Sequence, residues 1–209
     1  MTILIFGDSI TQGFHDTVYG GWCNLLVTEA MQRTIESDYK KDLSVFNLGI
    51  SGNNSEDLLD RFKNESAPRA EGETVIVFAI GVNDSLYELH TGSHSVPLEK
   101  FKENINILLQ QAKVISEKIY ILGLTPVVEI EVNPIPWNVA YGLTSKAIQN
   151  YDSALENIAE NAGAIFISMS DVWRGEVGQY LTDGLHPNAE GHKKMFERVR
   201  EVFIKDGIL

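Results

Sequence analysis

Short apolar runs alternate with amphipathic stretches along the whole chain, and this alternation limits the possible folds more than any other feature. Each run has the length and composition of a buried strand, and apolar residues at helical spacing follow it. The predicted strands cover residues 2–6, 43–47, 74–80, 119–122 and 164–167. The predicted helices cover about 20–35, a segment beginning at Ser55 as a cap, a long segment after Pro97, about 144–162, and the segment after His186. Such alternation favours parallel pairing through right-handed crossovers, so we expect an α/β fold, a three-layer α/β/α sandwich around a five-stranded parallel sheet.

Length, charge and cysteine content narrow the class of protein. A chain of 209 residues with 44% hydrophobic and 22% charged residues fits a single domain over residues 1–209. The net charge of −12 argues against a nucleic acid or an anionic membrane as partner. No apolar run approaches the ~20 residues of a membrane helix, and Met1 leads into the first strand without a secretory signal. Cys23 has no partner for a disulfide. These features predict a cytoplasmic protein, and they say nothing of its oligomeric state.

Polar and small residues follow four of the five predicted strands. Ser9 comes after the first strand, Gly52 after the second and Asn83 after the third, while Asp183 and His186 lie between the fifth strand and the last helix. Because the carboxyl ends of parallel strands meet at one edge of the sheet, these residues are expected to share one cleft. Taken singly, each could be an ordinary turn or helix-entry residue. Their joint placement favours a functional site.

This set of residues is what acyl transfer requires. A serine hydroxyl is a weak nucleophile until a base takes its proton, and His186 is the best base in the sequence. Asp183 could hold the other ring nitrogen of that histidine and stabilise its charged form. The Asn83 amide and the backbone N–H groups of Gly52 and Ser9 are candidate donors to an oxyanion.

The motifs that carry these residues resemble the four sequence blocks of the SGNH (GDSL) hydrolase family. They are GDSIT at residues 7–11, NLGISG at 47–52, GVND at 81–84 and DGLHP at 183–187, in the order of that family. The resemblance implies a flavodoxin-like sheet of strand order 2-1-3-4-5 and hydrolysis of an ester or thioester through an acyl-serine intermediate, as in GDSL-type esterases and lipases. It implies Ser9 as nucleophile, Asp183 and His186 as its triad partners, and Gly52 and Asn83 with Ser9 as the oxyanion hole.

Other functional interpretations have less support. His90 and His94 have the spacing of two metal ligands on a helix, but their surroundings predict a loop and no third ligand is near, so we expect no metal and no cofactor. His15 and His192 have no evident partner and are expected at the surface or behind the site. The same acyl-serine could serve an acyltransferase that uses an alcohol or sugar acceptor. A binding module with an idle site is the remaining alternative.

The substrate is predicted only as a class. Ile10, Asn53 and the loop 124–138, including Pro126 and Val127, are the expected lining of the pocket. That loop is rich in apolar side chains, which favours an acyl chain or an acetyl group over a heavily charged ligand. The polar stretch 85–95 and the loop 124–138 are both expected to lack regular structure. The sequence therefore predicts a small-molecule ester or thioester with a short acyl group.

Overall fold

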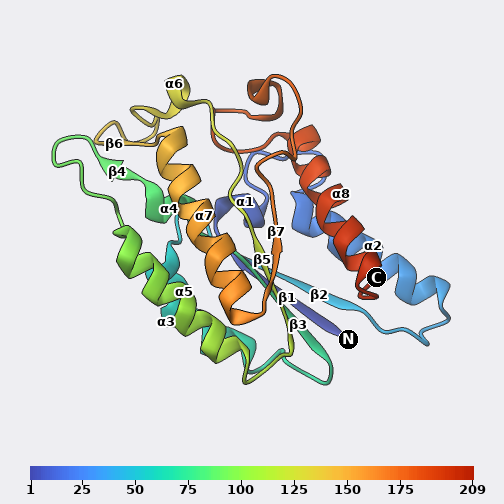
Figure 1. Ribbon diagram of the computed structural model, residues 1–209. Helices are drawn as coiled ribbons and strands as arrows, with labels where there is room; N and C mark the ends of the chain where they lie inside the picture. The colour runs from blue at the N-terminus through green and yellow to red at the C-terminus, as the bar shows by residue number, and fades with distance from the viewer.

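The centre of the protein is a five-stranded parallel sheet, seen in a computed structural model that describes residues 1–209 (Figure 1). Its strands are β1 (Thr2–Gly7), β2 (Ser44–Gly49), β3 (Thr74–Ala79), β5 (Lys118–Leu122) and β7 (Ile165–Ile167). They lie in the order β2-β1-β3-β5-β7, and all neighbours pair in parallel. Counted along the chain this order is 2-1-3-4-5, which confirms the flavodoxin-like topology.

Helices cover both faces of the sheet. Helices α2 (Trp22–Glu36) and α8 (Ala189–Lys205) pack together on one face (Figure 1). On the other face lie α3 (Ser55–Ser66), α5 (Leu98–Ala112) and α7 (Ser145–Ala162), with α5 between its two neighbours. The predicted three-layer sandwich is therefore confirmed. None of these helices combines the length and the apolar character that a membrane crossing needs.

The core sits against the two central strands. All six residues of β1 are buried, because strands pair on both sides of it and helices cover both of its faces. Its apolar side chains belong to one continuous cluster of 47 buried residues. A side-chain cap begins α3: Asn54, and not Ser55 as the sequence suggested, accepts from the N–H groups of Glu56 and Asp57. Ser55 is instead the first helical residue and is fully buried.

Two segments expected to lack regular structure hold short elements. Strand β4 (Tyr87–Glu88) pairs antiparallel with β6 (Tyr141–Gly142), which ties the loop after β3 to the long loop after β5. One turn of helix, α6 (Glu129–Val132), lies in that long loop, and a 3₁₀ turn (Val177–Tyr180) precedes α8. Elements of two to four residues are too short to produce a hydrophobic period, so the sequence gives no sign of them.

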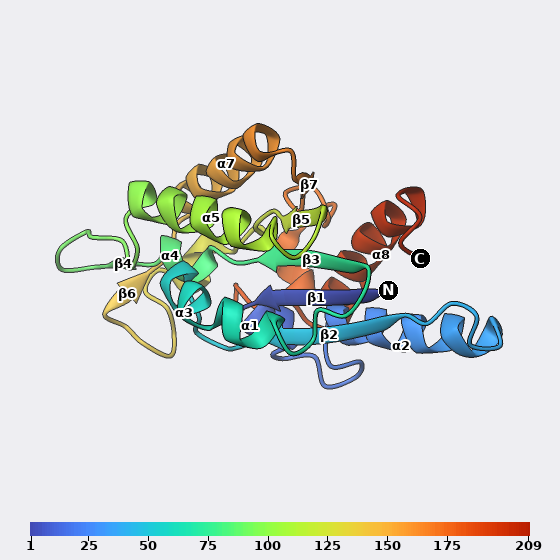
Figure 2. The same cartoon turned by 90° about the horizontal axis from the view of Figure 1, so that it is seen from below.

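The carboxyl edge of the sheet carries two further one-turn helices. Helix α1 (Ser9–Gln12) follows β1, and α4 (Val82–Ser85) follows β3. In Figure 2 the arrowheads of β1 and β3 point toward these turns, while the N-terminus lies at the opposite edge of the sheet. The residues that the sequence singled out are thus gathered at one edge.

Candidate active site

Ser9 stands on a tight turn at the end of β1, as the first residue of α1. Asp8 caps this helix, and its carboxylate accepts a hydrogen bond of 2.9 Å from the backbone N–H of Ile10. Glycine is required before the turn, because a Cβ on Gly7 would collide with the Thr11 side chain. The N–H of Ser9 occupies the first helical position, where no carbonyl within the helix can accept from it. The local sequence thus fixes both the hydroxyl and the N–H of Ser9.

Two hydrogen bonds connect Ser9 to His186 and then to Asp183. Ser9 Oγ lies 2.9 Å from His186 Nε2, although the two residues are 177 positions apart. His186 Nδ1 lies 2.8 Å from Asp183 Oδ2. The second carboxylate oxygen, Oδ1, accepts from the backbone N–H groups of Leu185 and His186 at 3.1 and 2.8 Å. The DGLHP turn therefore holds the acid and the imidazole in one orientation.

The charge on Asp183 sets the tautomer of His186. Burial alone would raise the pKa of Asp183, but hydrogen bonds from His186 and Leu185 outweigh it and hold the pKa below its usual value. An ionised carboxylate can only accept hydrogen bonds, so a neutral His186 carries its proton on Nδ1. The lone pair of Nε2 then faces the Ser9 hydroxyl. This arrangement can remove a proton from Ser9.

Gly52 and Asn83 line the same cleft as the imidazole. The Asn83 amide donates one hydrogen to the carbonyl of Asn53 at 2.9 Å, which fixes the side chain and leaves its second N–H for another acceptor. Gly52 has φ +84°, a conformation that strains residues with a Cβ, while the space around it is open. Backbone conformation rather than crowding is therefore the reason for glycine at this position. The second N–H of the Asn83 amide and the backbone N–H of Gly52 are therefore candidate donors to a ligand in the cleft.

One cleft collects all five residues of the predicted site. Its lining consists of Ser9, Gly52, Asn83, Asp183 and His186 together with Phe14, His15, Ser51, Trp137 and Leu185. The loop that carries Trp137 was expected to line the pocket, but the sequence did not indicate which of its side chains faces the cleft. Phe14 lies five residues after Ser9, on the turn that follows α1. Their positions depend on loop conformations that have no sequence period.

His15 and His192 both have partners that the sequence did not reveal. His15 Nδ1 lies 3.5 Å from Asp183 Oδ2, with its side chain 31% exposed. His192 is buried, and its ring nitrogens contact the N–H of Trp22 at 3.3 Å and the carbonyl of Phe14 at 3.4 Å. Burial lowers the pKa of His192 to about 4, so this residue stays neutral near pH 7 and supports the turn at Phe14.

Three side chains of the kinds that bind metal ions lie close together in the cleft. Ligand atoms of His15, Asp183 and His186 lie within 4.8 Å of one another. Asp183 and His186 are already engaged in the hydrogen bonds to Ser9 and to the backbone, so these bonds account for their arrangement. His94 bonds the Ser85 carbonyl through Nδ1 at 2.9 Å, and His90 is exposed on the loop.

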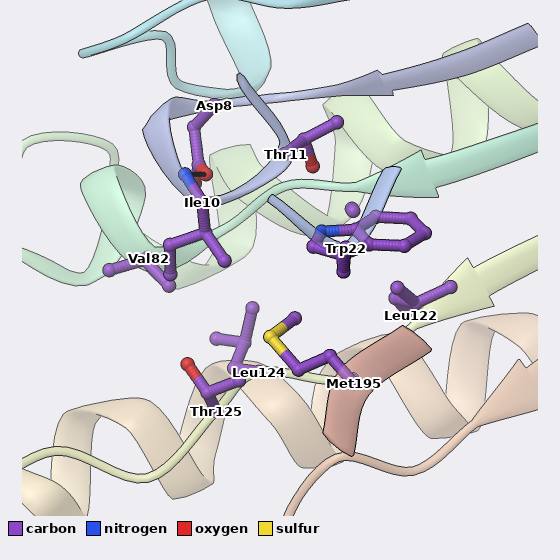
Figure 3. Close-up of a pocket in the computed structure, with 11 residues that line it drawn as sticks. Asp8, Ile10, Thr11, Trp22, Val82, Leu122, Leu124, Thr125 and Met195 are labelled. Atoms are coloured by element: carbon purple, nitrogen blue, oxygen red, sulfur yellow. Dashed lines mark hydrogen bonds between the residues drawn. The ribbon is translucent and has the colours of Figure 1, made fainter. Parts of the chain in front are cut away.

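Of the expected pocket lining, the loop 124–138 contributes Trp137 to this cleft, whereas Ile10, Asn53, Pro126 and Val127 lie outside it. Ile10 is turned inward by the helical step after Ser9 and lines a small cavity under α1, together with Trp22, Leu124 and Met195 (Figure 3). Asn53 accepts from Arg61 Nε at 2.7 Å through its side chain. Pro126 and Val127 belong to the long loop but not to the cleft wall. Three polar atoms around the cavity, Thr11 Oγ1, Trp22 Nε1 and Thr125 Oγ1, have no partner in the protein.

A buried carboxyl group ties together the segments that bear Gly52 and Asn83. Asp84 follows Asn83 on α4 and accepts from the N–H of Ser55, at the start of α3, at 3.0 and 3.1 Å. Burial raises the pKa of Asp84 to about 6, although the hydrogen bonds from Ser55 work against burial. Burial likewise raises the pKa of Asp8 to about 6. The loop that bears Gly52 is thus attached to α4 through a partly protonated acid.

This raised pKa predicts a pH-dependent stability. Between pH ~4 and pH ~6 native Asp84 binds more protons than unfolded Asp84, so the free energy of unfolding falls as pH rises through this window. A change from 3.8 to about 6 corresponds to about 3 kcal/mol at ~1.4 kcal/mol per pH unit. Denaturant unfolding at pH 4 and pH 7 tests this expectation. The free energy of unfolding of wild type should fall between the two pH values by more than that of Asp84→Asn, because the amide does not titrate. The exposed Asp60→Asn is the control, and a pH-independent difference between wild type and Asp84→Asn would contradict the expectation.

Sequence comparison identifies the family of the chain. The sequence model of the GDSL-like Lipase/Acylhydrolase family matches residues 5–194. The chain belongs to this family. The SGNH/GDSL resemblance drawn from the four blocks is thereby confirmed, and so is the class of the enzyme, a carboxylic ester hydrolase.

Curated relatives and solved structures agree with this assignment. The chain is 26% identical over 208 residues to the isoamyl acetate-hydrolyzing esterase 1 homolog of Rattus norvegicus, covering 93% of this chain and 78% of the relative. The human homolog is 24% identical over 210 residues, covering 94% and 79%. The fold resembles the acetylxylan esterase Axe2 of Geobacillus stearothermophilus with a TM-score of 0.72, at 20% identity and coverage of 96% and 92%. A lipase/acylhydrolase of Enterococcus faecalis gives a TM-score of 0.73, at 21% identity and coverage of 97% and 94%.

Proposed function

We propose that this GDSL-family esterase hydrolyses small carboxylic esters with a short acyl group, through an acyl intermediate on Ser9. The observation that carries the proposal is the hydrogen-bonded series Ser9 Oγ–His186 Nε2–His186 Nδ1–Asp183 Oδ2, at 2.9 and 2.8 Å. It supplies a nucleophile, a base of the right tautomer and an anion that stabilises the charged base. The same geometry would accept a thioester.

In the first step His186 takes the hydroxyl proton as Ser9 Oγ attacks the carbonyl carbon of the ester. The carbonyl oxygen becomes an oxyanion, for which the N–H groups of Ser9 and Gly52 and the Asn83 amide are the proposed donors. The protonated His186 then gives its proton to the leaving oxygen, and the C–O bond to the alcohol breaks. In the second step water attacks the acyl carbon while His186 removes its proton; His186 then gives this proton to Ser9 Oγ as the bond between Oγ and the acyl carbon breaks, which releases the acid and free Ser9.

The shape of the cleft favours two properties of the reaction: water as the acyl acceptor, and a short acyl group in the ester. Gly52, Phe14 and Trp137 are exposed, so water reaches the acyl-enzyme from solvent. This supports hydrolysis over transfer to an alcohol or sugar. Behind Ser9 the core is closed by Ile10 and Val82, and the small cavity there is too small for an alkyl chain. Relatives named for isoamyl acetate and acetylxylan act on acetyl esters, which agrees with a short acyl group.

Hydrolysis of p-nitrophenyl acetate, butyrate, octanoate and palmitate tests the proposal. We expect kcat/KM to be highest for acetate or butyrate and at least about tenfold lower for octanoate, because the longer chain finds no pocket. An optimum at octanoate or beyond would exclude the short-acyl preference. Failure of the folded protein to hydrolyse any of the esters would exclude the proposed reaction.

Replacement of Asn83 tests the oxyanion hole. Asn83→Ala should lower kcat by about 10²–10³-fold with little change in KM, because its amide would act on charge that develops only in the transition state. The matched control is Asn106→Ala, an exposed amide on α5 that bonds the carbonyl of Lys102. Steady-state kinetics with p-nitrophenyl acetate separates the two constants. An effect confined to KM would assign Asn83 to ground-state binding instead.

A further inference from the structure

Two exposed aromatic rings border the imidazole of His186. Phe14, from the turn after α1, is 45% exposed, and Trp137, from the long loop after β5, is 52% exposed. Their ring centroids lie 5.0 and 5.2 Å from that of His186. Both rings line the same cleft as Ser9. Large aromatic side chains held half open to solvent beside a reactive group are typical of binding sites.

The backbone on the Phe14 side is fixed by hydrogen bonds. The N–H of Phe14 donates to the Ser9 carbonyl at 2.9 Å, and its carbonyl accepts from the buried His192 at 3.4 Å. The Asp16 carboxylate accepts three backbone N–H groups, from Val18, Tyr19 and Gly21, at 2.9–3.0 Å. The backbone that carries the Phe14 ring is therefore held in place before any substrate arrives.

The Trp137 side is fixed in the same way. Backbone bonds close the turn around it, from Ile135 to Tyr141 at 2.9 Å and from Tyr141 to Asn138 at 3.0 Å. A further bond, from Val128 N–H to the Gly184 carbonyl at 2.9 Å, joins this loop to the turn that carries His186. Because the backbone on both sides is already ordered, only side-chain freedom is lost when a ligand covers the two rings.

The role of His186 decides which part of the ester meets these rings. His186 Nε2 must give its proton to the leaving oxygen, so that oxygen comes within hydrogen-bond distance of the imidazole. Carbon atoms attached to it then lie against the rings that contact His186. The acyl carbonyl faces the other way, toward Gly52 and Asn83. The His15 ring also lies 5.1 Å from that of His186 and stacks on Phe14 at 4.3 Å, but its Nδ1 lies 3.5 Å from Asp183 Oδ2, so His15 contacts the acid as well.

We propose that Phe14 and Trp137 form the subsite for the alcohol part of the ester and select alcohols with an apolar, C–H-rich face. This inference rests on the proposed hydrolysis through Ser9. Aryl, cyclic and branched alkyl groups present such a face, and so does one side of a pyranose ring. No Lys or Arg lines the cleft, and Asp183 adds a negative charge. Alcohols that carry phosphate or carboxylate are therefore disfavoured.

A series of acetates with different alcohols tests the subsite, because kcat/KM reports every step through release of the alcohol. Ethyl and cyclohexylmethyl acetate have leaving groups of similar basicity, so their ratio isolates binding. Benzyl acetate and an acetylated methyl glucoside extend the series to aryl and sugar faces. We expect kcat/KM of wild type to be about tenfold or more higher for cyclohexylmethyl than for ethyl acetate.

Trp137→Ala should remove most of this preference. We expect a drop of about tenfold or more for cyclohexylmethyl and benzyl acetate, mainly through KM, and less than about threefold for ethyl acetate. Trp137→Phe should restore most of the loss. The ratio of p-nitrophenyl acetate to butyrate should stay unchanged, because the acyl side is untouched. Val139→Ala and Val18→Ala, exposed on the same two turns but outside the cleft, are the matched controls.

The possible outcomes distinguish a failure of the subsite proposal from a failure of the proposed hydrolysis. An equal loss for ethyl and cyclohexylmethyl acetate in Trp137→Ala would mean that the ring only positions His186, and would overturn the subsite. A flat alcohol profile in active wild type would overturn it as well. Absence of turnover with every ester would overturn the proposed hydrolysis and, with it, the subsite. A preference for the glucoside over the cyclohexyl ester would support the subsite and identify a sugar as its occupant.

Discussion

Replacement of Ser9 by alanine is expected to lower kcat by on the order of 10⁶-fold while the protein stays folded. The change removes the only atom of the residue that can attack a carbonyl, and with it the hydrogen bond of 2.9 Å to His186. The loss of stability should be small, about 1 kcal/mol, because a single side-chain hydrogen bond is removed and no apolar contact is lost. Kinetics with p-nitrophenyl acetate and a thermal melt measure both effects.

A second serine in the cleft provides the matched control. Ser51 also lines the cleft, but its hydroxyl donates to Gln12 Oε1 at 2.9 Å and has no base beside it. Ser51→Ala should therefore keep most of the activity. A fluorophosphonate should label wild type and Ser51→Ala at Ser9, and should not label Ser9→Ala. More than about 1% residual activity in Ser9→Ala, given the size of the expected loss, would place the nucleophile elsewhere.

The sequence was informative where the chemistry depends on the ends of long strands. Runs of four to seven apolar residues predicted the five sheet strands, and Ser9, Gly52, Asn83 and His186 all follow such runs. Parallel pairing then brings these positions to one edge of the sheet, and this placement does not depend on the conformation of the loops. The structure places them in one cleft, and their catalytic roles stay a prediction.

The loop 124–138 was predicted to line the cleft and contributes Trp137, but most individual side chains of the walls could not be predicted, for a physical reason. Ile10 follows Ser9 directly, but one helical step turns its side chain by about 100°, from the cleft into the core. Trp137 faces the cleft because three backbone hydrogen bonds shape its turn, and no pattern of side chains encodes that turn. His15 reaches Asp183 from a left-handed backbone conformation, φ +69°, that sequence does not reveal at a histidine.

The second large effect is expected for Asp183→Asn, which should lower kcat by about 10⁴-fold with the geometry intact. The reason lies in the way the DGLHP turn uses the two carboxylate oxygens. Oδ1 accepts the N–H groups of Leu185 and His186 at 3.1 and 2.8 Å, and only an oxygen can keep these bonds. The asparagine oxygen therefore takes this position, and its NH₂ group takes the position of Oδ2, facing His186 Nδ1.

An NH₂ group in that position reverses the tautomer of His186. Nδ1 must then accept a hydrogen bond, so the ring proton moves to Nε2 and points at Ser9. A nitrogen that already carries a proton cannot take one from the hydroxyl, and the base is lost although every residue is in place. Asp171→Asn, on an exposed acid that pairs with Arg198, is the control, and kcat with p-nitrophenyl acetate is the measurement. A loss below about tenfold would show that the carboxylate does not set the tautomer, since a wrong tautomer removes the base entirely.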